Sequence, residues 1–315
     1  MLKKLACVLL CALMLCVTLS GCSKPEMVMD EYDSLSGEAG YRRTVLYYPS
    51  DDGFIVPIMK LIPWEEGIGK AALSYLTDTT DNKISASMMG LKTIIPEGTQ
   101  VSLQIRDKNA IVNLAKLPEL ADASTEQQLV TAIVNTLSEF PTIDTVSFTL
   151  DGKCVKALPH GTRISGSMSA FSLNIEKSEL AVSTDDAYAM TLYFPNKTGS
   201  LNVPVTRYTE IEPTLSSRIT ALIEGPRTDR LMNCFPEGTK LISAEIVNNI
   251  AKIDLSADFI AATEQDGMLL AAYDALYLTA AQAGEVYALE IFAQGKPVDM
   301  SAMEVSAPMY VNEFK

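Results

Sequence analysis

Hydrophobic and polar residues alternate along two separate stretches of this chain. The apolar positions are Ala110, Val112 and Leu114 in one stretch and Ala251, Ile253 and Leu255 in the other. Each stretch follows a polar pair that suits a tight turn, Asp107-Lys108 or Asn248-Asn249. Because a period of two is typical of a strand with one buried face, each stretch predicts the second strand of an antiparallel hairpin.

A helical pattern precedes each hairpin. The apolar residues, spaced i, i+4, i+7 and i+8, are Ile68, Ala72, Tyr75 and Leu76 in the first case and Leu215, Ile219, Leu222 and Ile223 in the second. Gly225-Pro226 ends the second helix, since glycine can turn left-handed and proline cannot continue a helix. The first copy has no Gly-Pro pair at this point.

A second helix follows each hairpin. Its buried face is predicted from Leu129, Ile133, Leu137 and Phe140 in the first copy and from Leu269, Tyr273, Leu276 and Ala280 in the second. In the first copy, Ser124 and Gln127 fit a capping box at the helix start. An apolar strand then closes each copy, at 145–155 and at 287–298.

The connecting segments repeat as well. A strand, a turn and a second strand are expected at 46–57 and again at 192–204. A Pro-Glu-Gly-Thr corner precedes each hairpin, at 96–99 and 236–239, where proline suits the second position and glycine the fourth position of a type I turn. The tails at 167–174 and 306–312 correspond loosely.

The chain is therefore predicted to be an α+β protein with two tandem domains, 45–176 and 188–315. Each has the order β-β-α-β-β-α-β, with two helices packed on one face of a small, mostly antiparallel sheet. Adjacent aromatic pairs recur in the first strand of each domain, and one member of each is expected in the core. The pairs are Tyr47-Tyr48 and Tyr193-Phe194.

The start of the chain has the layout of a secretory signal peptide, with two lysines, an apolar run and then small residues. Its end, Leu-Ser-Gly-Cys at 19–22, resembles the lipobox of bacterial lipoproteins, which implies a leader at 1–21 and lipidation of Cys22. An ordinary signal peptide cut elsewhere is the alternative. A polar tether is expected at 22–44, and acyl chains would anchor the protein to the membrane.

The charge excludes some partners. The 315 residues carry a formal net charge of −14, and loss of the two leader lysines makes it −16. No basic face for nucleic acid or anionic lipid is expected. Beyond the leader and Cys22 only Cys154 and Cys234 remain, expected as two free, partly buried thiols, with one disulfide as the alternative.

The residues for catalysis are missing. With a single histidine, His160, and two cysteines, neither a catalytic set nor a typical zinc site is expected, and no cofactor motif occurs. The acidic pairs at 51–52 and 185–186 and the segment 227–230 are expected in solvated loops. Arg207, at the end of a strand, is the weak candidate for binding a ligand or partner, with a surface or ion-pair role as the more common alternative.

Several segments together resemble the GerMN domain of sporulation and spore germination. They are LYFPN and VPVTR near 192–207, ALIEGP at 221–226, FPEGTKLISAEI at 235–246, NNIAKIDLS at 248–256 and GKPV at 295–298. The resemblance covers about 46–172 and 192–312, is stronger in the second copy and implies kinship with ring-building domains of secretion assemblies. The first copy departs from it, with Met59-Lys60 in place of Thr206-Arg207.

These observations predict a non-enzymatic lipoprotein on the extracytoplasmic face of the cell membrane. The resemblance implies an assembly scaffold in sporulation or germination, with envelope or spore-assembly proteins or further copies of itself as partners. The alternatives are a sensor or regulatory lipoprotein and a module that binds an envelope ligand, neither related to sporulation.

Overall fold

One order of helices and strands occurs twice in the computed structural model of the protein, which describes residues 40–177, 186–265, 267–301 and 307–314. The residues from Arg43 onward belong to one compact unit. We call 40–177 the first repeat and 186–314 the second. The predicted leader, Cys22 and most of the predicted tether lie outside the described residues, as does Asp185.

The helices and strands occur in the predicted order. The first repeat contains β1 (Tyr41–Pro49), β2 (Ile55–Pro63), α2 (Ile68–Tyr75), α3 (Thr80–Ser87), β3 (Gln100–Arg106), β4 (Asn109–Ala115), α4 (Ala123–Ser138) and β5 (Thr145–Leu150). The second contains β6 (Tyr188–Pro195), β7 (Asn202–Thr209), α5 (Leu215–Ile223), β8 (Leu241–Val247), β9 (Ile250–Leu255), the 3₁₀ helix η3 (Ala257–Glu264), α6 (Met268–Ala280), β10 (Ala288–Ala293) and β11 (Lys296–Pro297). The predicted α+β order is confirmed.

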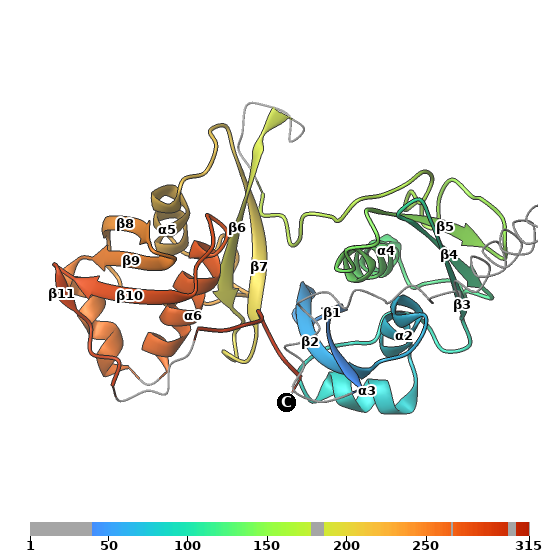
Figure 1. The fold of residues 1–315 in the computed structure, drawn as a ribbon, viewed down its shortest axis with the longest axis horizontal. Helices are drawn as coiled ribbons and strands as arrows, with labels where there is room; N and C mark the ends of the chain where they lie inside the picture. The colour runs from blue at the N-terminus through green and yellow to red at the C-terminus, as the bar shows by residue number, and fades with distance from the viewer. Residues whose placement is uncertain (1–39, 178–185, 266, 302–306, 315) are drawn as a thin grey trace, which may run out of the picture. The chain divides into compact units, whose positions relative to one another are not determined.

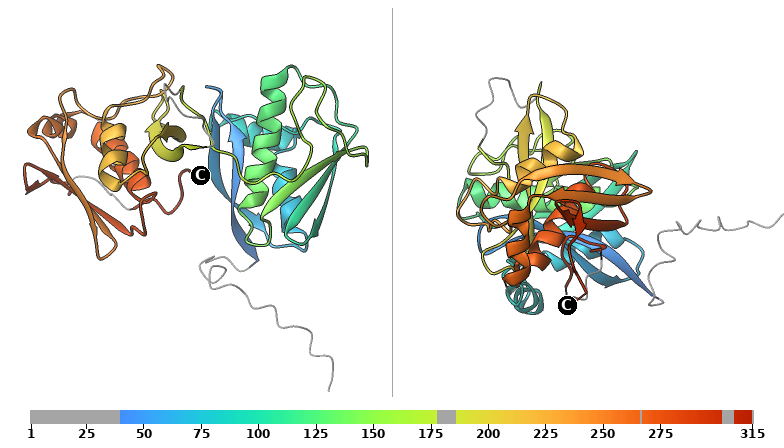
Figure 2. Two further views of the ribbon diagram at one scale, coloured as in Figure 1. Left: turned by 90° about the horizontal axis from the view of Figure 1, so that it is seen from above. Right: turned by 90° about the vertical axis from the view of Figure 1, so that its left-hand side faces the viewer.

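Each repeat has three layers (Figures 1 and 2). The helices α2 and α4 lie between the two-stranded sheet β1–β2 and the three-stranded sheet β3–β4–β5. In the second repeat, α5 and α6 lie between β6–β7 and the sheet β11–β10–β9–β8. The helices cover one face of the larger sheet, as predicted, and the separate hairpin covers their other side. This second cover explains why every residue from Leu129 to Leu137 in α4 is buried.

The sheets combine antiparallel and parallel pairs. β3 and β4 form an antiparallel hairpin, with Leu103 opposite Val112, and β5 runs parallel to β4, with Phe148 opposite Val112. The second repeat has the same pairs in β8–β9 and β9–β10. A parallel pair needs a crossover connection, which α4 and α6 supply. The alternating apolar residues of β4 and β9 are all buried, which confirms the predicted hairpins.

The turns confirm part of the prediction. Asp107, Lys108, Asn248 and Asn249 all have positive φ, as expected for tight hairpin turns. The corner before each hairpin is not the expected type I turn.

In that corner, Thr99 N donates to Pro96 O and Gly98 has φ +84°, so proline is the first residue and glycine the third. Positive φ at the third position is the type II geometry. Thr239, Pro236 and Gly238 repeat this arrangement. The expected type I turn is therefore wrong in both copies.

Three other details differ from the predictions. The cap of α4 is Asp122, whose carboxylate accepts a hydrogen bond from Thr125 N at 2.7 Å, so the predicted capping box of Ser124 and Gln127 is wrong. The unpredicted α3 is capped by Thr79, which accepts from Asn82 N. Strand β1 begins at Tyr41, within the range expected for the tether. Among the described helices, none is long and apolar enough to cross a membrane.

Candidate functional site

Asn174, at the end of the first repeat, joins the two repeats through its carboxamide. The side-chain oxygen accepts a hydrogen bond from Ile55 N at 2.9 Å, and the amide nitrogen donates to Ile55 O at 2.8 Å. The same nitrogen donates to Pro204 O of the second repeat at 2.7 Å. One side chain therefore binds β2 of its own repeat and β7 of the other.

Asn312, near the end of the second repeat, makes the same three bonds with the repeats exchanged. Its oxygen accepts from Asn202 N at 2.7 Å, and its amide nitrogen donates to Asn202 O at 2.9 Å and to Pro57 O at 3.0 Å. Pro57 and Pro204 are the prolines of the repeated Val-Pro pair. The two repeats thus meet through a pseudo-two-fold pattern, which we call the asparagine clasp.

Backbone hydrogen bonds extend the clasp along both tails. Glu176 N donates to Thr206 O in β7 at 2.9 Å, and Phe314 N donates to Met59 O in β2 at 2.9 Å. The reverse bonds are Thr206 N to Leu173 O at 3.0 Å and Met59 N to Asn312 O at 2.8 Å. Each tail therefore pairs with the second strand of the other repeat.

Arg207, the predicted weak candidate for ligand binding, lies inside this junction and is 3% exposed. Its Nε and one terminal nitrogen both lie 2.8 Å from the Oε2 atom of Glu176, which is itself 8% exposed. The other guanidinium bonds go to the carbonyl oxygens of Ala221 and Gly225, at 3.1 and 3.0 Å. The side chain is engaged by the protein's own groups, which is the ion-pair role that the sequence also allowed.

The first repeat has Lys60 where the second has Arg207. Lys60 Nζ lies 4.2 Å from the ring centroid of Phe314 and 5.3 Å from that of Tyr75, which are cation–π distances. Phe314 follows Asn312 by two positions, just as Glu176 follows Asn174. Burial lowers the pKa of Lys60. The same two places in the pseudo-two-fold pattern therefore hold an ion pair on one side and a cation–π contact on the other.

The repeated aromatic pairs also lie in corresponding places. Tyr48 and Phe194 are core residues, 2% and 0% exposed, so the prediction of one core residue in each pair is confirmed. Tyr193 is buried as well, and burial raises its pKa to about 12. Tyr47 and Tyr193 bond to corresponding residues that lie within α4 and α6 or just after their ends. These bonds are Tyr47 N to Thr136 Oγ1 at 3.0 Å, Tyr193 N to Thr279 Oγ1 at 3.2 Å, Tyr47 OH to Glu139 at 2.5 Å and Gln282 Nε2 to Tyr193 OH at 3.3 Å.

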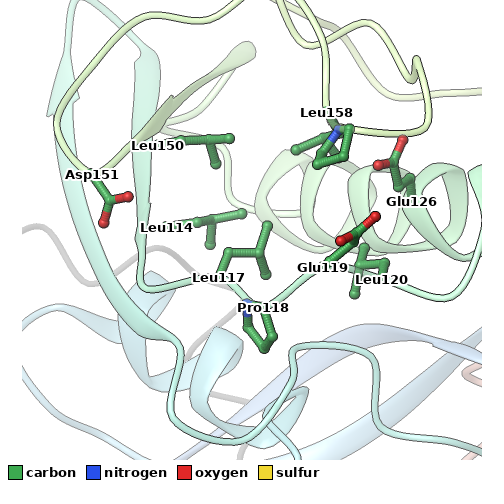
Figure 3. Close-up of a pocket in the computed structure, with 10 residues that line it drawn as sticks. Leu114, Leu117, Pro118, Glu119, Leu120, Glu126, Leu150, Asp151 and Leu158 are labelled. Carbon is green, nitrogen blue, oxygen red and sulfur yellow. The ribbon is translucent and has the colours of Figure 1, made fainter.

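A cavity of about 240 Å³ opens in the first repeat, beside the ends of β4 and β5 (Figure 3). Most of its wall is apolar and the rest is acidic. The lining residues are Leu114, Leu117, Pro118, Glu119, Leu120, Glu126, Leu150, Asp151, Leu158 and Pro159. Figure 3 shows Leu114, Leu117 and Leu150 between Asp151 on one side and Glu119 and Glu126 on the other. Sequence reasoning missed this cavity because its lining residues come from four separated segments.

Glu126 in the first turns of α4 has no exposed surface and faces backbone donors. His160 N donates to its Oε1 atom at 2.7 Å, and Thr162 N donates to its Oε2 atom at 3.1 Å. Burial works against the charged form, but the hydrogen bonds from His160 and Thr162 outweigh it and hold the pKa of Glu126 below its ordinary value. The cavity wall therefore contains a buried, ionised carboxylate.

The side chain of His160 contacts the segment that precedes α4. Its Nε2 atom lies 2.7 Å from Leu120 O and 3.8 Å from Glu119. No group of three or more His, Cys, Asp or Glu side chains in the described parts of the chain could hold a metal ion.

The two cysteines and Arg230, also considered in the sequence, do not form a common site. Both described cysteines are free, but Cys154 is exposed and Cys234 is buried, so the expectation of two partly buried thiols is wrong in detail. Burial raises the pKa of Cys234 to about 12. Arg230, expected in a solvated loop, donates to Asp52 O at 2.8 Å and stacks on Phe54.

Comparison with known proteins identifies the family to which these repeats belong. The family described as "Germane: Sporulation and spore germination" matches residues 45–156 and 191–299, and the chain belongs to this family. The spore germination protein GerM of Bacillus subtilis (strain 168) is 24% identical over 263 residues, which are 80% of this chain and 71% of that protein. The predicted GerMN resemblance is thus confirmed.

A solved structure shows the same fold. The tandem GerMN domains of the sporulation protein GerM from Bacillus subtilis align with a TM-score of 0.68, covering 87% of this chain and all of theirs, at 24% identity. The chain is therefore a homologue of a sporulation protein, with two GerMN domains in tandem.

Proposed function

We propose that the protein is a membrane-tethered, non-enzymatic scaffold that assembles with envelope or spore proteins during sporulation or germination. The observation that carries this proposal is the asparagine clasp, which holds two copies of one fold together. Each copy also has an edge strand that pairs with no further strand among the described residues. These edges are β3 and β8. An unpaired strand edge can accept a strand from another protein.

The remaining parts of the proposal come from the sequence and the family. Lipidation at Cys22 would hold the protein on the extracytoplasmic face of the membrane and raise its local concentration there. Membership in the Germane family supports the sporulation role. Further copies of the chain are also candidate partners, since the two repeats already bind each other through matching contacts.

The first experiment follows the protein through growth and sporulation of its source bacterium by immunoblot of separated membrane fractions. We expect it to accumulate after sporulation begins, in the membrane fraction, and a Cys22→Ala variant to leave that fraction. Constant presence in growing cells, or a host that forms no spores, would contradict the sporulation role and favour a sensor or regulatory lipoprotein.

The scaffold role has its own test. A photo-reactive amino acid at Gln104 on β3 or at Glu245 on β8 should cross-link specific envelope proteins or a second copy in sporulating cells. Both positions are exposed and lie on edge strands. The same group at Asp107, in a hairpin turn, is the matched control. If all three positions gave the same products, the edges would not be binding surfaces.

A further inference from the structure

The cavity of the first repeat combines an apolar wall with uncompensated negative charge. Its side chains supply three carboxylates, Glu119, Glu126 and Asp151, and no basic residue occurs among those that line it. Within the described residues, none of the three forms an ion pair with Lys or Arg, and the contact of Glu119 with His160 is 3.8 Å long. Glu126 is buried and satisfied by backbone donors, whereas Glu119 and Asp151 are exposed carboxylates at the rim of the cavity, and their negative charge beside an apolar wall favours a cationic group with an apolar stem.

The polar groups that do contact these carboxylates are mostly neutral backbone donors. Glu126 accepts from two backbone amides, and Asp151 accepts from Lys116 N at 2.9 Å. An ionised carboxylate has about four acceptor positions, so the exposed Asp151 retains capacity for an ammonium group, whereas Glu126 is fully buried and only adds negative charge to the wall. The leucine side chains between them leave space for an alkyl chain.

The segment after β9 in the second repeat differs in structure from the segment after β4 in the first. After β9 the chain forms η3, which buries Phe259 completely, and the ring lies 6.2 Å from that of Phe235. After β4 the first repeat has no helix before α4, and its segment 116–122 borders the cavity instead. The segment that borders the cavity therefore has a different structure in the two repeats.

We propose that this cavity binds a lysine side chain of a partner protein, with the methylene stem against the leucines and the ammonium next to the rim carboxylates. Lysine combines the two required properties, a long apolar stem and a compact cation with three donors. The net charge of −14 for the whole chain also favours a basic partner surface. The proposal rests on the scaffold function, and it specifies a lysine side chain as one of the groups by which a partner protein would bind.

The test uses leucine-methyl NMR of the full-length protein in detergent, titrated with the peptide acetyl-Ala-Lys-Ala-amide. Two further peptides replace lysine by norleucine, which keeps the stem, or by acetyl-lysine, which removes the charge. We expect saturable shifts of the Leu117 and Leu150 methyls with the lysine peptide and at least tenfold weaker binding of the other two. Equal binding of the norleucine peptide, or no shift at these methyls, would overturn the proposal.

Conservative variants test the charge. Glu119→Gln and Asp151→Asn together should weaken the lysine peptide at least fivefold. Asn keeps the acceptor for Lys116 N and tolerates the φ of +48° at position 151. Asp107→Asn, at the same φ, and Glu264→Gln, at an exposed position of the second repeat, are the matched controls and should leave binding unchanged. Binding that is insensitive to the rim variants would also overturn the proposal.

The two proposals can fail separately. If cross-links form at β3 and β8 in cells but the lysine peptide does not bind, the lysine site is wrong and the scaffold stands. If the peptide binds but no protein is cross-linked, the site stands and the scaffold function is wrong.

Discussion

The two sides of the asparagine clasp use one backbone pattern and two different side-chain chemistries. On the side of β7, Glu176 and Arg207 form an ion pair that is less than one-tenth exposed at both residues. On the side of β2, the corresponding contact is Lys60 above the ring of Phe314, which is partly buried. The asparagine bonds match in donor, acceptor and partner position on both sides.

The difference shows which part of the contact is constrained. The carboxamide of asparagine can satisfy an N–H and two C=O groups at once, so it fixes how each tail meets the strands. The residue two positions later only has to match the strand residue opposite. Arg207 also binds Gly225 O, at the Gly-Pro helix stop, and the first repeat lacks both that stop and the arginine. The two departures of the first repeat from the family pattern thus concern groups that contact each other in the second repeat.

The largest effect is expected for Arg207→Met. Methionine fills the volume but leaves the Glu176 carboxylate buried without its cation, which typically costs about 3–5 kcal/mol of unfolding free energy. Urea unfolding, monitored by circular dichroism, would measure this loss of unfolding free energy. The double variant Arg207→Met with Glu176→Leu should recover most of the loss. A loss below about 1 kcal/mol for the single variant would show that the pair is not desolvated.

Removal of the clasp side chains comes next. Asn312→Ala leaves backbone groups of both repeats without partners, and we expect a loss of about 2 kcal/mol. Asn174→Ala should cost about 1 kcal/mol more, because Asn174 has φ +48° and alanine is strained there. Asn174→Gly removes the bonds without that strain and should match Asn312→Ala. If Asn174→Gly and Asn312→Ala lost different amounts of unfolding free energy, the two sides of the clasp would not be energetically equivalent.

A smaller loss of unfolding free energy is expected for Lys60→Met, the counterpart of Arg207→Met. A partly exposed cation–π contact contributes about 0.5–1 kcal/mol, and methionine keeps the apolar packing of the stem. The same urea experiment applies to both variants. A loss as large as that of Arg207→Met would mean that the two sides of the clasp do not differ in desolvation.

Glu126 in the first repeat should contribute to the acid sensitivity of the protein. The pKa of Glu126 lies below its ordinary value of 4.5, so the folded protein binds fewer protons there than the unfolded chain. This stabilisation is complete above pH 4.5 and is lost as the pH falls through the lower folded-state value. Glu126→Gln should flatten the fall of melting temperature between pH 5 and pH 3. The first turn of α6 in the second repeat has no acidic residue. An unchanged slope would contradict the assignment.

The two thiols should differ in reactivity without any change in stability. Cys154 is exposed, whereas burial raises the pKa of Cys234 to about 12, which leaves very little thiolate at neutral pH. N-ethylmaleimide followed by peptide mapping should label Cys154 first and Cys234 only after unfolding. Rapid labelling of Cys234 in the native protein would show that the core of the second repeat opens easily.

The sequence by itself determined the local elements and their duplication. The period-two strands at β4 and β9 and the helical stripes of α2 and α5 are set by which residues must be buried, and that pattern is visible along the chain. The Asn-Asn and Asp-Lys turns follow from local backbone preferences. The local sequence does not decide where α4 begins, because Asp122, the observed cap, and Ser124 are both residue types that cap helices well.

Only the tertiary structure decided what joins the repeats and where the cavity lies. The partners of Asn174 are 119 and 30 residues away along the chain, and those of Asn312 are 255 and 110 residues away. Nothing in the local pattern indicates such pairs, since hydrogen bonds between distant residues depend on how whole layers pack. The burial of Arg207 has the same origin, because its position in a strand did not reveal that the tail of the first repeat would supply Glu176 to cover it.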